Sequence, residues 1–161
     1  MPQLDDMIRA NAKGGFAPVE AFSIHRDRLQ RRGRDIDPNV RVRIERGEKV
    51  PAADYIAMIQ DRARLVRAMD AALAGLDALV MPTTAIVAPT IAEVADPDIF
   101  AARNGALLRN TAIANAFDLC AISLPLPAQS SLPVGFMLVA RNRHDHHLFQ
   151  IAAGLERLFA A

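Results

Sequence analysis

The sequence has few of the residues on which several common chemistries depend. Its 161 residues include no tryptophan, one cysteine, and lysine only at Lys13 and Lys49. A lone cysteine cannot form an internal disulfide, which agrees with a reducing compartment. Because arginine stays protonated in proteins, only those two lysines could act as a neutral base. The sequence therefore excludes a disulfide scaffold and leaves lysine catalysis two candidates.

The sequence also lacks a charge bias and a long apolar run. Its 19 basic and 18 acidic residues leave a net charge of +1, so the total implies no acidic or basic partner. Residues 71–95 are nearly uncharged, but Gly75, Pro82 and Pro89 interrupt them too often for a membrane helix, which needs about 20 apolar residues. The first residues carry no signal-peptide pattern. We expect a cytoplasmic protein without a membrane partner.

Arginines gather between Arg26 and Arg34, at the end of a predicted helix. Such a run fits either a solvated last turn or a nucleic-acid patch. No aromatic residues are interleaved with these arginines and the net charge is near zero, which favours the solvated turn. We expect no nucleic-acid partner.

Hydrophobic spacing predicts an α/β protein. Apolar residues at alternating spacings of three and four follow Pro51 as far as Gly75, which is typical of a long helix. Residues 1–15 are expected to be a short helix or a loose segment, and residues 16–161 a single domain. Residues 82–101 contain three prolines and are expected to be a loop. The other expected helices are about 18–32, 38–46, 102–117 and 145–159, and the expected strands are 76–81, 119–124 and 134–140.

The three predicted strands make only a thin sheet. The run from Leu76 to Met81 is almost continuously apolar, and such a strand is normally covered on both faces. This pattern indicates a piece of a larger α/β sheet.

Several short stretches then occur in an order that is more specific than any one of them. They are Asp37–Gly47, Ala53–Tyr55, Arg62–Arg67, Asp77–Thr83, Ala88-Pro89, Asn110-Thr111, Asn115, Ala121–Pro125 and Leu132–Phe136. In this order they resemble the C-terminal part of the amidase signature family, serine hydrolases that cleave the carbon–nitrogen bonds of amides. The resemblance implies a mixed sheet, about three strands of it here, covered by helices.

The resemblance also implies a catalytic centre that this sequence does not contain. In the family a serine nucleophile, a second serine in a cis peptide and an upstream lysine do the chemistry, and a Gly-Ser-Ser-Gly stretch supplies backbone N–H groups to the oxyanion. No such stretch occurs here. The resemblance therefore implies an amidase segment that contributes sheet and cleft wall, with no catalytic residue, metal or cofactor of its own and no activity alone.

Three groups of reactive residue types have simpler interpretations. The pair Ser130-Ser131 follows Lys49 but has no flanking glycine, which favours turn residues over a nucleophile. Cys120 lies in an apolar strand pattern, where free cysteine usually packs as a small hydrophobe. The histidine cluster fits a solvated helix start better than a metal site; its residues are His144, Asp145, His146 and His147.

Short polar residues near the predicted strand ends are the candidate site. Buried, they would either form structural hydrogen bonds to the strands or line the substrate cleft of the complete enzyme. Arg43 resembles an arginine that glutamyl-tRNA amidotransferase A subunits use near the substrate amino acid, although a surface ion pair is the simpler interpretation. The candidates are Thr83, Thr84, Asn110, Thr111, Asn115 and Arg43.

Two functional hypotheses follow. In the first, the chain completes an amidase together with a missing N-terminal catalytic half, and a small amide is bound only by the complete enzyme. In the second, it is a non-enzymatic assembly or interaction module derived from the amidase fold. Open sheet edges predict association in either case, with the missing half or with another copy.

Overall fold

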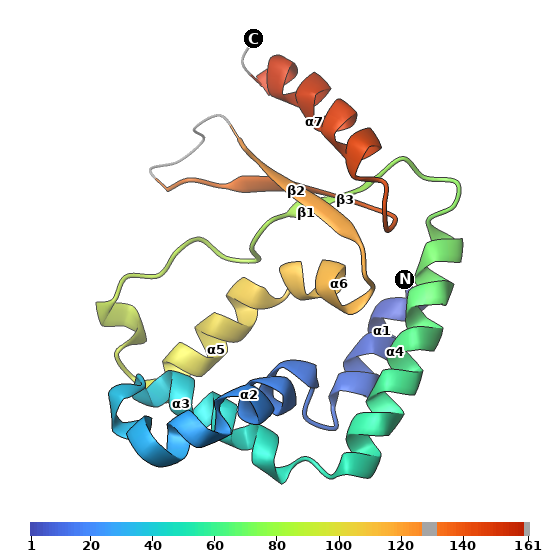
Figure 1. Ribbon diagram of the computed structural model, residues 1–161. Helices are drawn as coiled ribbons and strands as arrows, with labels where there is room; N and C mark the ends of the chain where they lie inside the picture. Colours follow the sequence, from blue (N-terminus) through green and yellow to red (C-terminus); the bar gives the residue numbers. More distant parts are fainter. Residues whose placement is uncertain (127–131, 160–161) are drawn as a thin grey trace. The chain divides into compact units, whose positions relative to one another are not determined.

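The computed structural model describes residues 1–126 and 132–159 and forms two compact units, Met1–Leu65 and Val66–Ala161 (Figure 1). The boundary falls within one long helix, α4. That residues 16–161 form one domain stays a prediction. The elements are α1 (Pro2–Asn11), α2 (Phe16–Arg32), η1 (Gly33–Asp35), α3 (Pro38–Glu45), η2 (Arg46–Lys49), α4 (Ala52–Ala72), β1 (Leu79–Pro82), η3 (Ala92–Val94), α5 (Pro97–Leu108), α6 (Thr111–Ala116), β2 (Cys120–Pro125), β3 (Gly135–Ala140) and α7 (Asp145–Phe159).

The first unit is helical and is held by close backbone packing. The Asp37 carboxylate caps α3 by accepting from the backbone N–H groups of Asn39 and Val40, at 2.9 and 3.2 Å. Gly47 is buried, and a Cβ there would collide with the backbone of Pro18. The chain can therefore bring the start of α2 against η2 only because residue 47 has no side chain.

Side chains join the beginning of α4 to the rest of the first unit. The Tyr55 hydroxyl donates to Glu20 at 3.1 Å, and the rings of Tyr55 and Phe16 meet edge to face with centroids 5.8 Å apart. Lys13, which follows α1, lies 3.4 Å from the carboxylate of Asp54. Of the two alternatives for residues 1–15, the short helix is the one observed, and α1 contains no buried residue.

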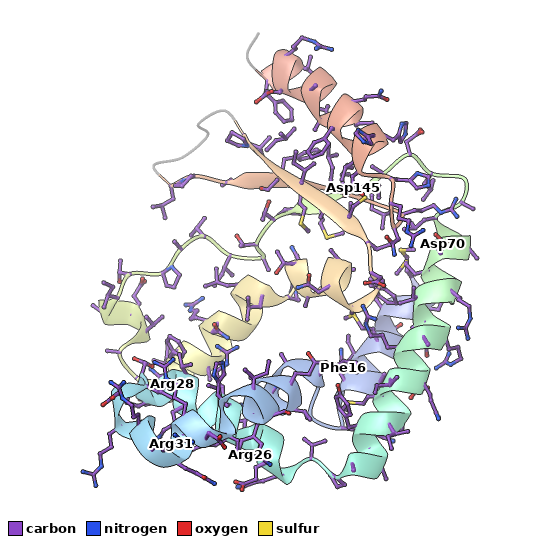
Figure 2. All side chains as sticks on the ribbon, in the orientation of Figure 1. Phe16, Arg26, Arg28, Arg31, Asp70 and Asp145 are labelled. Atoms are coloured by element: carbon purple, nitrogen blue, oxygen red, sulfur yellow. The ribbon has the colours of Figure 1, made fainter. Side chains whose placement is uncertain are left out.

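The arginines of α2 are solvated. Figure 2 shows Arg26, Arg28 and Arg31 along this helix, and all three are exposed. Arg31 lies 3.5 Å from Asp27, one helical turn earlier, and Arg32 lies 2.7 Å from Asp35. Local ion pairs therefore neutralise part of the positive charge of this segment, although exposed pairs of this kind add little stability.

The second unit contains an antiparallel sheet of three strands in the order β1-β3-β2. The central strand is β3, where Leu79 pairs with Val139 on one side and Ala121 with Val139 on the other. Helix α7 covers one face through a cluster that includes Leu138, and α6 covers the other through Ala114 against Val139 (Figure 1). The α/β class, the three strands and the cover on both faces are confirmed.

An ion pair ties the end of α4 to the end of β3. The Arg141 guanidinium donates through Nε and Nη2 to the two oxygens of Asp70, at 2.8 and 2.7 Å. This bidentate hydrogen bonding lowers the pKa of the Asp70 carboxyl. Asp70 lies on the last turns of α4, and Asp145 begins α7 (Figure 2).

Three predicted boundaries were wrong. The strand begins at Leu79 rather than at Leu76, which is 52% exposed. The expected loop of residues 82–101 ends early because Asp96 caps α5 and Pro97 occupies its first turn. The expected helix of residues 102–117 breaks near Asn110 into α5 and α6.

Candidate substrate-cleft wall

Polar groups from all three strands gather where β1 ends. The hydroxyl oxygens of Thr83 and Ser123 lie 2.5 Å apart, and the backbone N–H of Thr83 donates to the carbonyl of Gly135 at 2.8 Å. A Cβ at residue 135 would lie 2.6 Å from the Ser123 hydroxyl oxygen and closer still to that of Thr83. The two hydroxyls can therefore meet across the sheet only because β3 begins with glycine.

Asn110 attaches the junction between α5 and α6 to the same strand end. Its side chain is the only buried polar one among the described residues, and its Nδ2 donates to the carbonyl of Pro82 at 2.8 Å. The Nε of Arg109 donates to its Oδ1 at 3.4 Å. A buried amide needs such partners, since an unsatisfied one costs about 1–3 kcal/mol. Asn110 thus forms the hydrogen bond to the neighbouring strand that the structural alternative describes, and its place in a substrate cleft stays a prediction.

The structure thus brings together two of the predicted residues and leaves others apart from them. Asn110 bonds the carbonyl of Pro82, the residue that precedes Thr83. The Thr84 hydroxyl instead donates to the carbonyl of Ile86 at 2.8 Å. The Thr111 hydroxyl donates to the carbonyl of Leu108 at 3.2 Å, within its own turn, and Asn115 is exposed on α6. Whether any of them lines a substrate cleft stays a prediction.

Arg43 belongs to the first unit, on an exposed position of α3. The surface ion pair expected for it is not formed with any described residue. The positions one turn away are Asn39 and Gly47, neither of which is a carboxylate, and Glu45 pairs instead with Arg41 at 3.4 Å. No carboxylate one helical turn away therefore orients the guanidinium of Arg43.

Sequence reasoning missed Ser123 and Gly135 as members of the site. The available signal was strand alternation, which puts a polar Ser123 on the face opposite Leu124. What could not be read was the pairing of both outer strands with β3, which brings Ser123 to Thr83 although 40 residues separate them in the chain.

The hydroxyl pair is suited to binding rather than to nucleophilic attack. Within the described part of the chain, Thr83 and Ser123 bond each other and neither hydroxyl bonds a histidine, lysine or carboxylate that could remove its proton. Two hydroxyls joined by one hydrogen bond still have a second hydrogen and free lone pairs, which can bond a ligand. The alternative serines, Ser130 and Ser131, lie outside the described residues.

Cys120 is held as a thiol. Its Sγ donates to the carbonyl of Arg141 at 3.1 Å, and it packs against the cluster beneath α7. Burial, and then the nearby charge of Asp145, raise the pKa of the Cys120 thiol. A protonated, half-buried thiol is a poor nucleophile, which agrees with the packing interpretation.

The histidine cluster at the start of α7 is exposed. The Nε2 of His147 lies 3.2 Å from the carboxylate of Asp77, in the segment that leads into β1. Across the described ranges, no three or more histidine, cysteine or acidic side chains come together as metal ligands. Likewise, no helix in those ranges has the length and apolar character to cross a bilayer.

Comparison with known proteins now gives the site a family context. A family model described as amidase matches residues 5–149. The chain belongs to the amidase family. A curated relative, 2-amino-5-chloromuconic acid deaminase of Comamonas testosteroni, is 28% identical over 163 residues, which cover 98% of this chain and 34% of the relative. This amidase family chain therefore spans about a third of the length of that relative.

Two solved structures agree with the fold. A crystal structure of an amidase superimposes with a TM-score of 0.78 at 21% identity, over 97% of this chain and 36% of the other. A 6-aminohexanoate cyclic dimer hydrolase superimposes with a TM-score of 0.65 at 25% identity, over 78% of this chain and 28% of the other. The predicted resemblance to the amidase family is confirmed.

Proposed function

We propose that this chain is a C-terminal amidase segment that supplies part of the central sheet and one wall of a substrate cleft. The observation that carries the proposal is the polar row at the end of β1 in a chain of the amidase family: Thr83 bonds Ser123, and Asn110 bonds the carbonyl of Pro82, the residue before Thr83. Sheets of α/β enzymes commonly bind ligands at strand ends. The complete enzyme would act in the cytoplasm on a small amide.

The reaction would be hydrolysis of a carbon–nitrogen amide bond through an acyl-serine intermediate. A serine oxygen attacks the amide carbonyl, the amine leaves with a proton, and water then releases the acid. Relatives named as a deaminase and as a cyclic dimer hydrolase support this reaction class. The nucleophile, the lysine and the oxyanion donors would come from the region of an amidase that this chain does not match.

The Thr83–Ser123 pair would hold a polar group of the bound amide. Thr83 is half-buried and Ser123 is exposed, so the pair can be reached by a ligand while its geometry is set by β3. Asn110 would act as a positioning residue, because it bonds the strand end and not the open side. Removing one hydrogen bond to a substrate costs about 0.5–1.5 kcal/mol, which predicts a rise in KM of about 2- to 12-fold.

The experiment is a chimera in which residues 5–149 replace the matched region of the chloromuconic acid deaminase relative. Thr83→Val and Ser123→Ala are expected to raise KM and to leave kcat within about twofold. Ser23→Ala, which removes an exposed hydroxyl from α2, is the matched control and should change neither constant. Equal effects of all three substitutions on a folded, active chimera would contradict the assignment.

The isolated chain is expected to show no amidase turnover, because it has no Gly-Ser-Ser-Gly stretch. Turnover that Ser130→Ala or Ser131→Ala abolishes would overturn this proposal. The lack of a Gly-Ser-Ser-Gly stretch in this sequence also favours the second candidate function, a non-enzymatic module that binds a separate catalytic half or another copy. A chimera that folds, binds substrate and never turns over would support the module.

A further inference from the structure

The first unit contains a groove between α2 and the two elements that follow it, α3 and η2. The chain reverses after α2, so α3 runs back along it, and Gly47 of η2 packs against Pro18 near the start of α2. The groove has a volume of about 530 Å³, and its whole lining comes from residues 22–49. Small-molecule sites in proteins commonly have volumes of about 300–1,000 Å³.

One part of the groove is apolar. Phe22 and Leu29 lie two turns apart on one face of α2, and Val42 lines the groove from α3. Both α2 side chains are half-buried, and Val42 is 47% exposed, so the groove leaves apolar surface in contact with water. A ligand with an apolar body would remove that surface from water.

Three basic side chains also line the groove. Arg26 comes from α2, and Arg46 and Lys49 come from η2. Side chains three residues apart eclipse in a 3₁₀-helix, so Arg46 and Lys49 lie one above the other on the same side of η2. Neither of these two forms an ion pair with a described residue. Two adjacent cations are therefore available to an anion.

The acidic residues of the lining compensate this charge only in part. They are Glu45 and Glu48. Glu45 lies 3.4 Å from Nε of Arg41, which does not line the groove, so a cation outside the groove already balances its charge. Glu48 alone remains against three basic side chains, and the groove keeps an excess of positive charge.

We propose that this groove binds a small organic anion, a carboxylate with an apolar body. The carboxylate would lie between Arg46 and Lys49, and the body would extend along Val42 and Leu29. The planar guanidinium of arginine matches the geometry of a carboxylate, and lysine adds a second charge. A neutral polar ligand would use neither the cations nor the apolar surface.

The size of the groove favours a small molecule over a protein partner. A specific protein interface buries about 800 Å² on each side, which extends well beyond a groove between two helices and one short turn. The site lies in the first unit and uses none of the residues of the proposed cleft wall. It therefore neither rests on the proposed function nor fails with it.

Fluorescence titration of the full chain with 1-pyrenebutyrate tests the proposal. This probe has a large apolar ring and a carboxylate, and 1-pyrenebutanol is its uncharged analogue. In about 0.15 M salt, where distant charges are screened, we expect 1-pyrenebutyrate to saturate with a Kd of about 10–100 μM. Pyrenebutanol should bind at least about fivefold more weakly, because its hydroxyl forms no charge-assisted hydrogen bond as an acceptor.

Substitutions of the cations test where the carboxylate binds. Arg46→Gln and Lys49→Gln should each weaken 1-pyrenebutyrate about three- to tenfold and change pyrenebutanol binding less than about twofold. Arg28→Gln removes the same charge from α2 outside the groove and should change neither probe (Figure 2). All three side chains are exposed, so we expect the variants to fold, and circular dichroism checks this.

A second pair of variants tests the apolar part. Val42→Asn should weaken both probes about threefold or more, because it places an amide where the apolar body would lie. Val40→Asn is the matched control: Val40 is on the same helix, is 45% exposed and does not line the groove. It should leave both titrations unchanged.

Four results would overturn the proposal. They are an absence of saturable 1-pyrenebutyrate binding, equal affinities for the acid and the alcohol, an Arg28→Gln effect as large as that of Arg46→Gln, and a Val40→Asn effect as large as that of Val42→Asn. Displacement of the bound probe by the unmatched part of 2-amino-5-chloromuconic acid deaminase would also overturn it, because the groove would then be a protein contact.

Discussion

Gly135→Ala is the sharpest test of how the polar row is built. The added Cβ would lie 2.6 Å from the Ser123 hydroxyl oxygen, 3.0 Å from the Thr83 Cβ and closer to the Thr83 hydroxyl oxygen. Both hydroxyls must move, which loses a hydrogen bond of about 1 kcal/mol and adds overpacking of about 1–3 kcal/mol. The free energy of unfolding should therefore fall by about 2–4 kcal/mol, a large part of the 5–15 kcal/mol typical of a domain.

Urea unfolding followed by circular dichroism measures this loss. Gly105→Ala and Gly154→Ala are matched controls, because an added Cβ at either helical glycine meets no atom within 4 Å. Each is expected to stabilise its helix by about 0.5–1 kcal/mol.

A second background isolates the cause of the loss. In a Thr83→Ala and Ser123→Ala chain the colliding oxygens are absent, so Gly135→Ala should cost less than half as much. An equal cost in both backgrounds would refute the reasoning, because the loss would then not come from the hydroxyl bridge. A Gly135→Ala chain as stable as the two helical controls would refute it directly.

Three more predictions concern other parts of the chain. Gly47→Ala should lower the free energy of unfolding by roughly 3 kcal/mol or more in urea titrations, because the backbone of Pro18 cannot move aside as a side chain would. Arg141 lowers the folded-state pKa of Asp70 below its unfolded value, so this pair stabilises above the unfolded pKa and the stability is lost as pH falls through the folded pKa. Thermal melting between neutral pH and pH 2 should show less acid dependence for Asp70→Asn than for the wild type. The Cys120 thiol should react with a disulfide reagent at pH 8 far more slowly when folded than in urea, because burial raises its pKa.

Elements with a strong local signal were predicted well. The spacing after Pro51 predicted α4, which runs from Ala52 to Ala72. Pro38 predicted the start of α3, because proline suits the first turn of a helix. The break near Asn110 was not predicted, because no proline or glycine marks that position. The Asn110 side chain donates to the carbonyl of Pro82, which is 28 residues away in the chain.

The candidate site was predicted only in part, for the same reason. Thr83 and Asn110 were identified because a short polar residue beside an apolar run must find a partner. Ser123 and Gly135 were missed because their role depends on strands that pair across the sheet. A surface ion pair was predicted for Arg43, but the residues one helical turn away are not carboxylates and cannot form it.

The α/β class, the family and the absence of the glycine-rich serine stretch can be read from the amino-acid sequence, because each is carried by local patterns or by the order of short motifs. The position of β3 between β1 and β2 became visible only in the folded chain. That order brings the Thr83 and Ser123 hydroxyls together over Gly135, beside the strand end that Asn110 holds. Strand pairing joins residues far apart in the chain, and no local pattern records the partner.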